Sequence, residues 1–219
     1  MRPIPPSVRQ RLKQLPPNAP IRIYTLQHRN VWDNLVPNGL LHGDHGHIDE
    51  EDIRPYNWMR ASMQKRMPNH SGHLPIWAVL KPNSKHHYVP YNSPMVEIGA
   101  VVPLHRILAS DFSLYHMVMN NAPILNEWME HDNFTCTKAE KEQSWDTIFD
   151  LSPRVGVDAT HWGQADIIQL CVDTIKHNEI FVVRSIPSRT HRTPNTCLYY
   201  NNNIQLPPPI YLYNSSKKT

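Results

Sequence analysis

Six short segments that bear aromatic or branched apolar side chains recur along the chain, each followed by a polar or helix-forming stretch. Most of them have the length and composition of β-strands. The strands and helices predicted in this way interleave without the regular period of βαβ units. We therefore predict a single α+β domain in which helices pack on a mixed sheet that is split or bent. The segments are 21–27, 56–59, 75–80, 96–102, 144–149 and 157–162.

Composition shifts along the chain divide it into three expected parts. A basic, proline-rich arm with a short helix covers residues 1–20, the α+β domain covers 21–186, and an irregular tail rich in Pro, Asn and Tyr covers 187–219. Inside the domain we expect strands at 21–26, 75–80, 95–102, 157–162 and 180–186, helices at 28–36, 51–67, 110–121 and 137–149, and a helical or extended stretch at 164–176. Ser110 is the expected cap of its helix, and Thr137 with Glu140 forms a capping box.

Composition also limits the class of protein. With 7 glycines against 21 prolines, the chain contains neither a glycine-rich dinucleotide fingerprint nor a phosphate loop, and it has no Gly-x-Ser-x-Gly motif. The net charge of +3 is small and does not by itself indicate a nucleic-acid partner. Three cysteines far apart in sequence favour a reducing compartment over a disulfide framework. Because we find neither a signal peptide nor a membrane-spanning run, we expect no membrane partner and a cytoplasmic location.

A histidine cluster is the densest group of possible metal ligands. His42, His45 and His47 lie within six residues, with Asp49 just beyond. Neutral imidazole is a good ligand for transition metals, but this spacing matches no established ligand pattern. A metal site and a solvated loop are both open interpretations of this segment.

Polar side chains that alternate along predicted strands are the candidate binding groups. Thr25 and Gln27 share one face of a strand, opposite Tyr24. Asp158, Thr160 and Trp162 share a face in the same way, and this trio could bind a ribose and stack a ring. Glu97 lies inside an apolar strand, where a carboxylate either faces water or lines a cleft. For each set, an ordinary solvent-facing strand is the alternative.

These motifs, in this order, resemble a bacterial and phage family known as domain of unknown function 3841. The resemblance spans roughly residues 21–186, and Asp158 stands where the family pattern has glutamine. The matching residues are Thr25 and Gln27; Tyr56, Trp58 and Met59; Pro75, Ile76 and Trp77; Ser110, Asp111 and Phe112; and Thr160 and Trp162.

The strand order is also similar to that of small NAD-dependent ADP-ribosyltransferases, and this likeness implies a function by analogy. NAD would be the co-substrate, and a protein or nucleic acid would accept the ADP-ribose. Glu97 and Asp158 are the catalytic candidates, because a nearby anion stabilises an oxocarbenium-like centre. The expected NAD-binding residues are Tyr24, Thr25, Gln27, Tyr56, Trp77, Thr160 and Trp162. The alternative is a non-catalytic phage or host protein-binding module that uses the surface around 82–94 and 198–213.

Overall fold

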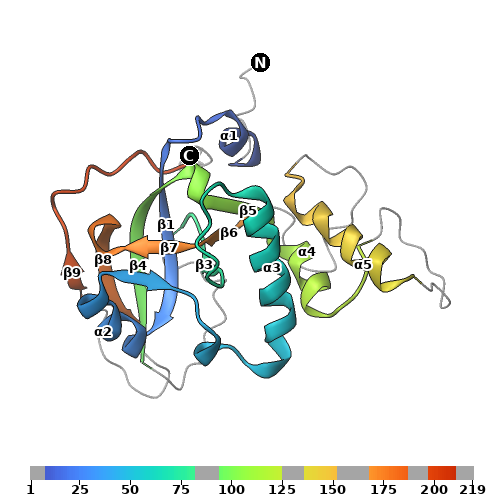
Figure 1. Ribbon diagram of the computed structural model, residues 1–219. Helices are drawn as coiled ribbons and strands as arrows, with labels where there is room; N and C mark the ends of the chain where they lie inside the picture. The colour runs from blue at the N-terminus through green and yellow to red at the C-terminus, as the bar shows by residue number, and fades with distance from the viewer. Residues whose placement is uncertain (1–7, 82–93, 125–135, 152–167, 187–196, 211–219) are drawn as a thin grey trace, which may run out of the picture.

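The computed structural model describes residues 8–81, 94–124, 136–151, 168–186 and 197–210 (Figure 1). The α-helices in these ranges are α1 (Val8–Gln14), α2 (Arg29–Asn38), α3 (Ile53–Arg66), α4 (Phe112–Met119) and α5 (Lys138–Ser144). The strands are β1 (Pro20–His28), β2 (Leu40–His42), β3 (Ile76–Ala78), β4 (Met95–Pro103), β5 (Ile107–Asp111), β6 (Ile168–Val172), β7 (Thr174–Lys176), β8 (Ile180–Ile186) and β9 (Cys197–Tyr200).

The strands form three antiparallel sheets. One has the order β1-β4-β8-β9, a second has the order β3-β6-β5, and β2 pairs with β7. The first two sheets meet where Tyr24 of β1 and Val79, just after β3, exchange backbone hydrogen bonds of 2.8 Å each. The fold is therefore α+β with a split sheet, as predicted. The expectation of a mixed sheet is not met in the described part of the chain, because every pairing there is antiparallel.

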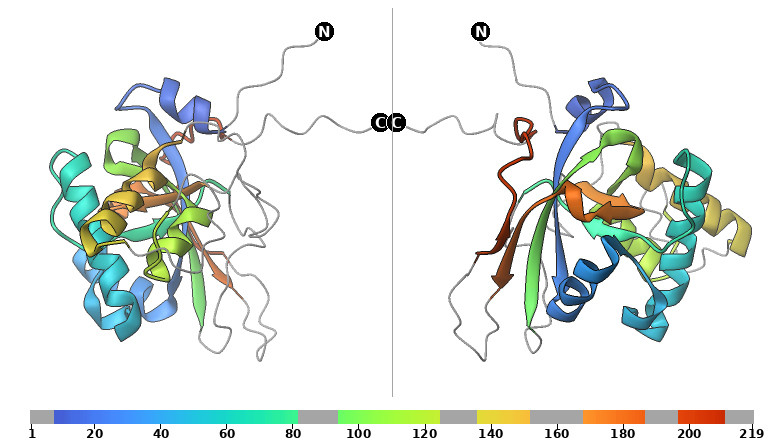
Figure 2. Two further views of the ribbon diagram at one scale, coloured as in Figure 1. Left: turned by 90° about the vertical axis from the view of Figure 1, so that its right-hand side faces the viewer. Right: turned by 60° about the vertical axis from the view of Figure 1, so that its left-hand side comes forward.

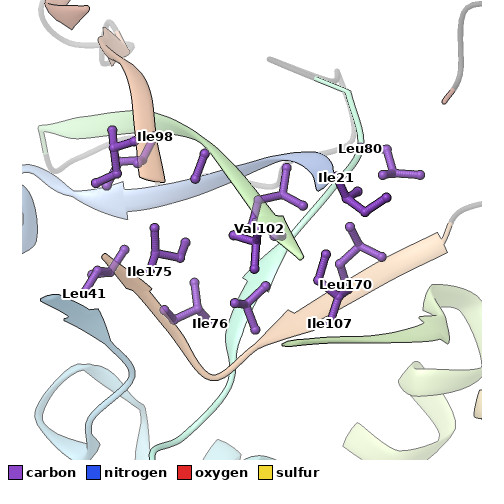
Figure 3. Close-up of a cluster of buried hydrophobic side chains, with 14 of the residues drawn as sticks. Ile21, Leu41, Ile76, Leu80, Ile98, Val102, Ile107, Leu170 and Ile175 are labelled. Carbon is purple, nitrogen blue, oxygen red and sulfur yellow. The ribbon is translucent and has the colours of Figure 1, made fainter. Parts of the chain in front are cut away.

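The main hydrophobic core lies between the four-stranded and the three-stranded sheets (Figure 3). Alternate side chains of a strand point to the same face, and this explains which residues form the core. Strand β1 contributes Ile21 and Ile23, and β6 contributes Leu170. We call the sheet faces that line this core the inner faces. The opposite faces, which point away from this core, are the outer faces.

Helices cover the outer face of the three-stranded sheet (Figures 1 and 2). Met59 and Met63 of α3, one helical turn apart, are completely buried with Trp145, which follows α5. Trp77 and Cys171 form part of the sheet side of this second cluster. No helix among the described residues combines the length and apolar character that crossing a bilayer requires.

Most predicted elements are confirmed, with two corrections. Ser110 does not cap a helix: it is buried in β5, and the side chain of Asp111 accepts the capping hydrogen bond from the backbone N–H of Leu114. The stretch 164–176, predicted to be either helical or extended, is extended where it is described, as β6 and β7. In addition, β9 continues the four-stranded sheet inside a segment that we expected to be irregular. The strand expected at 157–162 lies outside the described residues.

Candidate functional site

The alternation of side chains along β1 separates the predicted binding residues into two sets. Thr25 and Gln27 follow Ile23 on the inner face, whereas Tyr24 lies on the outer face against Phe181, with ring centroids 5.8 Å apart. A single cleft would have to reach around the strand to include both sets. The structure therefore does not bring Thr25 and Gln27 together with the outer-face residues.

Thr25 makes its contacts inside the protein. Its side chain is buried, and its hydroxyl donates a 2.7 Å hydrogen bond to the backbone carbonyl of Trp77. The amide nitrogen of Gln27 donates to the same hydroxyl at 2.7 Å. This chain of hydrogen bonds ties β1 to β3 beside the Tyr24–Val79 bridge, so it fixes the backbone that carries the Trp77 ring.

Glu97 is a buried carboxylate on the outer face of the four-stranded sheet. It stands opposite Leu26 on β1 and Arg184 on β8, and directly opposed residues of antiparallel strands share a face. Its side chain is 4% exposed, and one carboxylate oxygen lies 3.3 Å from Nη1 of Arg184, whose side chain is 44% exposed. The pair therefore joins a buried carboxyl group to a guanidinium group that still reaches solvent.

Three aromatic rings meet at Trp77. The Tyr56 ring of α3 packs edge-on against Trp77 with centroids 5.4 Å apart, and Tyr115 of α4 lies 4.7 Å from it on a tilted plane. Burial raises the pKa of Tyr56 to about 12, although a hydrogen bond with the Trp77 side chain opposes the shift. Burial also raises the pKa of Tyr115, and by more. Both phenols consequently stay protonated near neutral pH and can donate hydrogen bonds.

The outer faces of the two sheets are continuous at the bridge between them. Tyr24 and Val79 pack in one small cluster, and Trp77 is two residues from Val79 on the same side of its strand. Tyr24 and Glu97 lie on the outer face of the four-stranded sheet, and Trp77, in contact with Tyr56, lies on the outer face of the three-stranded sheet. Asp158, Thr160 and Trp162 lie outside the described residues.

Comparison with known protein families identifies a family that this chain matches. Residues 22–141, more than half of the chain, match the family described as domain of unknown function 3841 (DUF3841). The chain belongs to the DUF3841 family. The matched range contains Thr25, Gln27, Tyr56, Trp77 and Glu97. No curated protein and no solved structure matches the chain.

Three buried polar residues that sequence reasoning did not assign to a binding site lie on the helix-covered side of the three-stranded sheet in this DUF3841 protein. Ser110, Tyr115 and Gln169 are all buried, on β5, α4 and β6. Arg184, the partner of Glu97, was also missed. One signal was available for Gln169, because a polar residue inside the apolar run Ile-Gln-Leu-Cys-Val is the same pattern that singled out Glu97.

Two of the three clustered histidines, His42 and His45, have described side chains. Nδ1 of His42 lies 3.3 Å from the carbonyl oxygen of Gly43, and the His42 ring stacks on His73 with centroids 4.2 Å apart. Within the described residues, no three His, Cys, Asp or Glu side chains are placed to hold a metal ion. The side chain of His47 lies outside the described part of the protein.

A serine, a histidine and an aspartate also meet near this cluster. The Ser71 hydroxyl donates to Asp173 at 2.7 Å, and Nε2 of His70 lies 3.4 Å from the same carboxylate oxygen. A nucleophilic triad requires the serine to donate to the histidine, which then acts as its base. Because Ser71 donates to Asp173, this arrangement joins a loop to the bend between β6 and β7 and does not activate a nucleophile.

Proposed function

We propose that this DUF3841 protein is an NAD-dependent ADP-ribosyltransferase-like enzyme that modifies a macromolecular acceptor, either a protein or a nucleic acid. One observation supports the proposal: the described residues hold a buried carboxyl group, Glu97, on the outer face of one sheet and an aromatic cluster, Trp77 and Tyr56, on the outer face of the sheet that is bridged to it. A carboxylate and aromatic rings are the groups that suit a substrate with a planar ring on a sugar. NAD is such a substrate.

The proposed reaction breaks the bond between the nicotinamide ring and the ribose of NAD. The bond between the ribose carbon and the nicotinamide nitrogen breaks, and nicotinamide leaves with the bonding electrons. The positive charge that develops on the ribose is stabilised by a fixed anion in a water-poor site, the role we assign to Glu97. An oxygen or nitrogen of the acceptor then bonds to the ribose carbon, and its proton passes to solvent.

We assign the binding of the rest of NAD to side chains on the outer faces of the two sheets. Trp77 and Tyr56 provide faces on which nicotinamide can stack. Arg184 is half exposed and offers a cation for the diphosphate. In this arrangement Thr25 and Gln27 act indirectly, since their hydrogen bonds hold the backbone of Trp77.

Calorimetry with NAD and an assay of nicotinamide release test the proposal. Glu97→Gln should lower the rate of release roughly 10²–10³-fold, the loss typical when one group that stabilises developing charge is removed. Glu142→Gln is the matched control, because Glu142 lies on α5 in an exposed pair with Lys138. Circular dichroism establishes that both variants fold. If wild-type protein at millimolar NAD releases no heat and no nicotinamide, the proposal is wrong.

One observation favours a second, non-catalytic function as a protein-binding module. Strand β9 is an edge strand of the four-stranded sheet. Tyr200 on this strand is 56% exposed, and among the described residues it is the large hydrophobic side chain that is exposed. Sheet edges with exposed aromatic residues can pair with an added strand. A partner retained by wild-type protein and lost by Tyr200→Ser, with no NAD turnover in either, would support this alternative.

A further inference from the structure

Three buried polar atoms near the aromatic cluster have no hydrogen-bond partner among the described residues. They are Oγ of Ser110, Oη of Tyr115 and Oε1 of Gln169. The exposed fractions of these residues are 0%, 5% and 8%. Buried polar side chains in folded proteins are nearly always hydrogen-bonded, so three unpaired groups in one region need an explanation.

The three groups lie on one side of the three-stranded sheet. Ser110 on β5 stands directly opposite Gln169 on β6, so their side chains share a face. Two residues further along β6, on that same outer face, Cys171 stands opposite Trp77. Tyr115 covers this part of the sheet through its contact with Trp77. The unpaired atoms therefore lie on the side of the sheet that carries the Trp77 ring, which we assign to NAD.

Keeping these groups polar costs folding stability. Phenylalanine in place of Tyr115, or alanine in place of Ser110, would fill similar space without burying an unsatisfied group. Natural proteins retain such costs mainly where function needs the group. The unpaired atoms thus point to a ligand that supplies the missing hydrogen bonds.

We propose that Ser110, Tyr115 and Gln169 bind a neutral planar carboxamide, the nicotinamide group of NAD. This proposal rests on the function proposed above and names the residues that recognise the leaving group. The two hydroxyls donate to the carboxamide oxygen, and Oε1 of Gln169 accepts from its NH₂ group. The Trp77 ring provides the apolar contact. None of the three groups carries a charge, so a neutral ligand fits them better than a phosphate or a carboxylate.

The first test concerns the free protein. Tyr115→Phe and Ser110→Ala remove atoms that have no partner, so the melting temperature should stay the same or rise. Ser144→Ala is the matched control, because the Ser144 hydroxyl donates to the Lys141 carbonyl and accepts from the backbone N–H of Ile124. It should lower the melting temperature by about 2–4 °C. A comparable fall in Tyr115→Phe and Ser110→Ala would overturn the idea that their atoms are unpaired.

The second test uses nicotinamide itself as the probe. Millimolar nicotinamide should raise the melting temperature of the wild-type chain, and calorimetry gives its dissociation constant. Tyr115→Phe and Gln169→Met should each weaken binding about tenfold, the effect of losing one buried hydrogen bond. Ser144→Ala should bind nicotinamide as the wild type does. Equal affinity in all variants, or no binding to the wild type, would overturn the assignment.

Turnover of NAD separates this inference from the proposed function. If NAD is hydrolysed or transferred at equal rates by wild-type protein and by Tyr115→Phe, the carboxamide site is wrong and the enzymatic proposal stands. If nicotinamide binds as predicted but NAD is not consumed, the carboxamide site stands and the enzymatic proposal fails.

Discussion

At the scale of single residues, His70 shows how burial sets a charge state. Its side chain is 2% exposed, and Nδ1 accepts a 2.9 Å hydrogen bond from the N–H of Gly72, so the ring proton resides on Nε2, facing Asp173. Burial lowers the pKa of His70; His73 and Arg60 act in the same direction, and Asp173 opposes them. The neutral ring is therefore the form that the folded state favours.

The sign of the pH dependence follows from this shift. Below about pH 6.5 the unfolded chain protonates His70 while the folded state resists, so the unfolded state binds more protons and the free energy of unfolding falls as the pH falls. His70→Gln should flatten this fall between pH 6.5 and 5, as measured by urea denaturation. His45→Gln, at an exposed position, is the control. Identical slopes in wild type and His70→Gln would contradict the prediction.

At the scale of elements, Gly43 allows β2 to approach the segment before β3. Gly43 bridges to Leu74, and a Cβ atom at position 43 would lie 2.5 Å from the Leu74 carbonyl oxygen. Because that oxygen belongs to the backbone, the contact cannot be relieved by turning a side chain. Gly43→Ala should lower the free energy of unfolding by about 1–3 kcal/mol.

Gly46→Ala provides the comparison for this prediction. There the nearest atom to a new Cβ is a carboxylate oxygen of Asp44, at 3.1 Å, which can move with its side chain. Chemical denaturation should show a much smaller loss for Gly46→Ala than for Gly43→Ala. Equal losses would mean that the close approach to Leu74 does not constrain the fold.

Local sequence patterns predicted a helix or strand correctly where the hydrophobic periodicity agreed with the residues that begin or end such an element. The alternation around Ile23 and Ile98 and the spacing of Met59 and Met63 identified β1, β4 and α3, because burial on one face leaves a periodic trace in sequence. Ser110 failed as a cap because Asp111 can cap the same helix, and tertiary pairing with Gln169 drew Ser110 into a strand. Whether Ser110 caps a helix or joins a strand depends on Gln169, which is 59 positions away in sequence. A local sequence pattern does not contain this information.

At the scale of the whole molecule, the candidate site depends on which faces the folded sheets turn toward each other. Sequence alternation placed Thr25 and Gln27 opposite Tyr24, and the structure agrees. It could not say that the inner face would be filled by the other sheet, or that Glu97 and Trp77 would lie on the outer faces of two different sheets. That assignment comes from strand pairings across the chain, and pairing register is a long-range property.

The junction between the two sheets is itself testable through Thr25. Thr25→Val keeps the shape of the side chain but removes the donor to the Trp77 carbonyl and the acceptor for Gln27. We expect a loss of roughly 1–3 kcal/mol in unfolding free energy, since buried polar groups lose their partners. Hydrogen exchange at the amides of Tyr24 and Val79, which bond across the junction, should also become faster.

Thr147→Val separates a general loss of stability from opening of this junction. The Thr147 hydroxyl donates to the carbonyl of Ser144, a local bond in the helical layer, so its removal should leave exchange at Tyr24 and Val79 close to that of the wild type. If both variants accelerate exchange equally at these amides, the hydrogen bonds of Thr25 do not hold the sheets together. If Thr25→Val alone does so and also weakens NAD binding, the inner-face threonine positions an outer-face site through the backbone of Trp77.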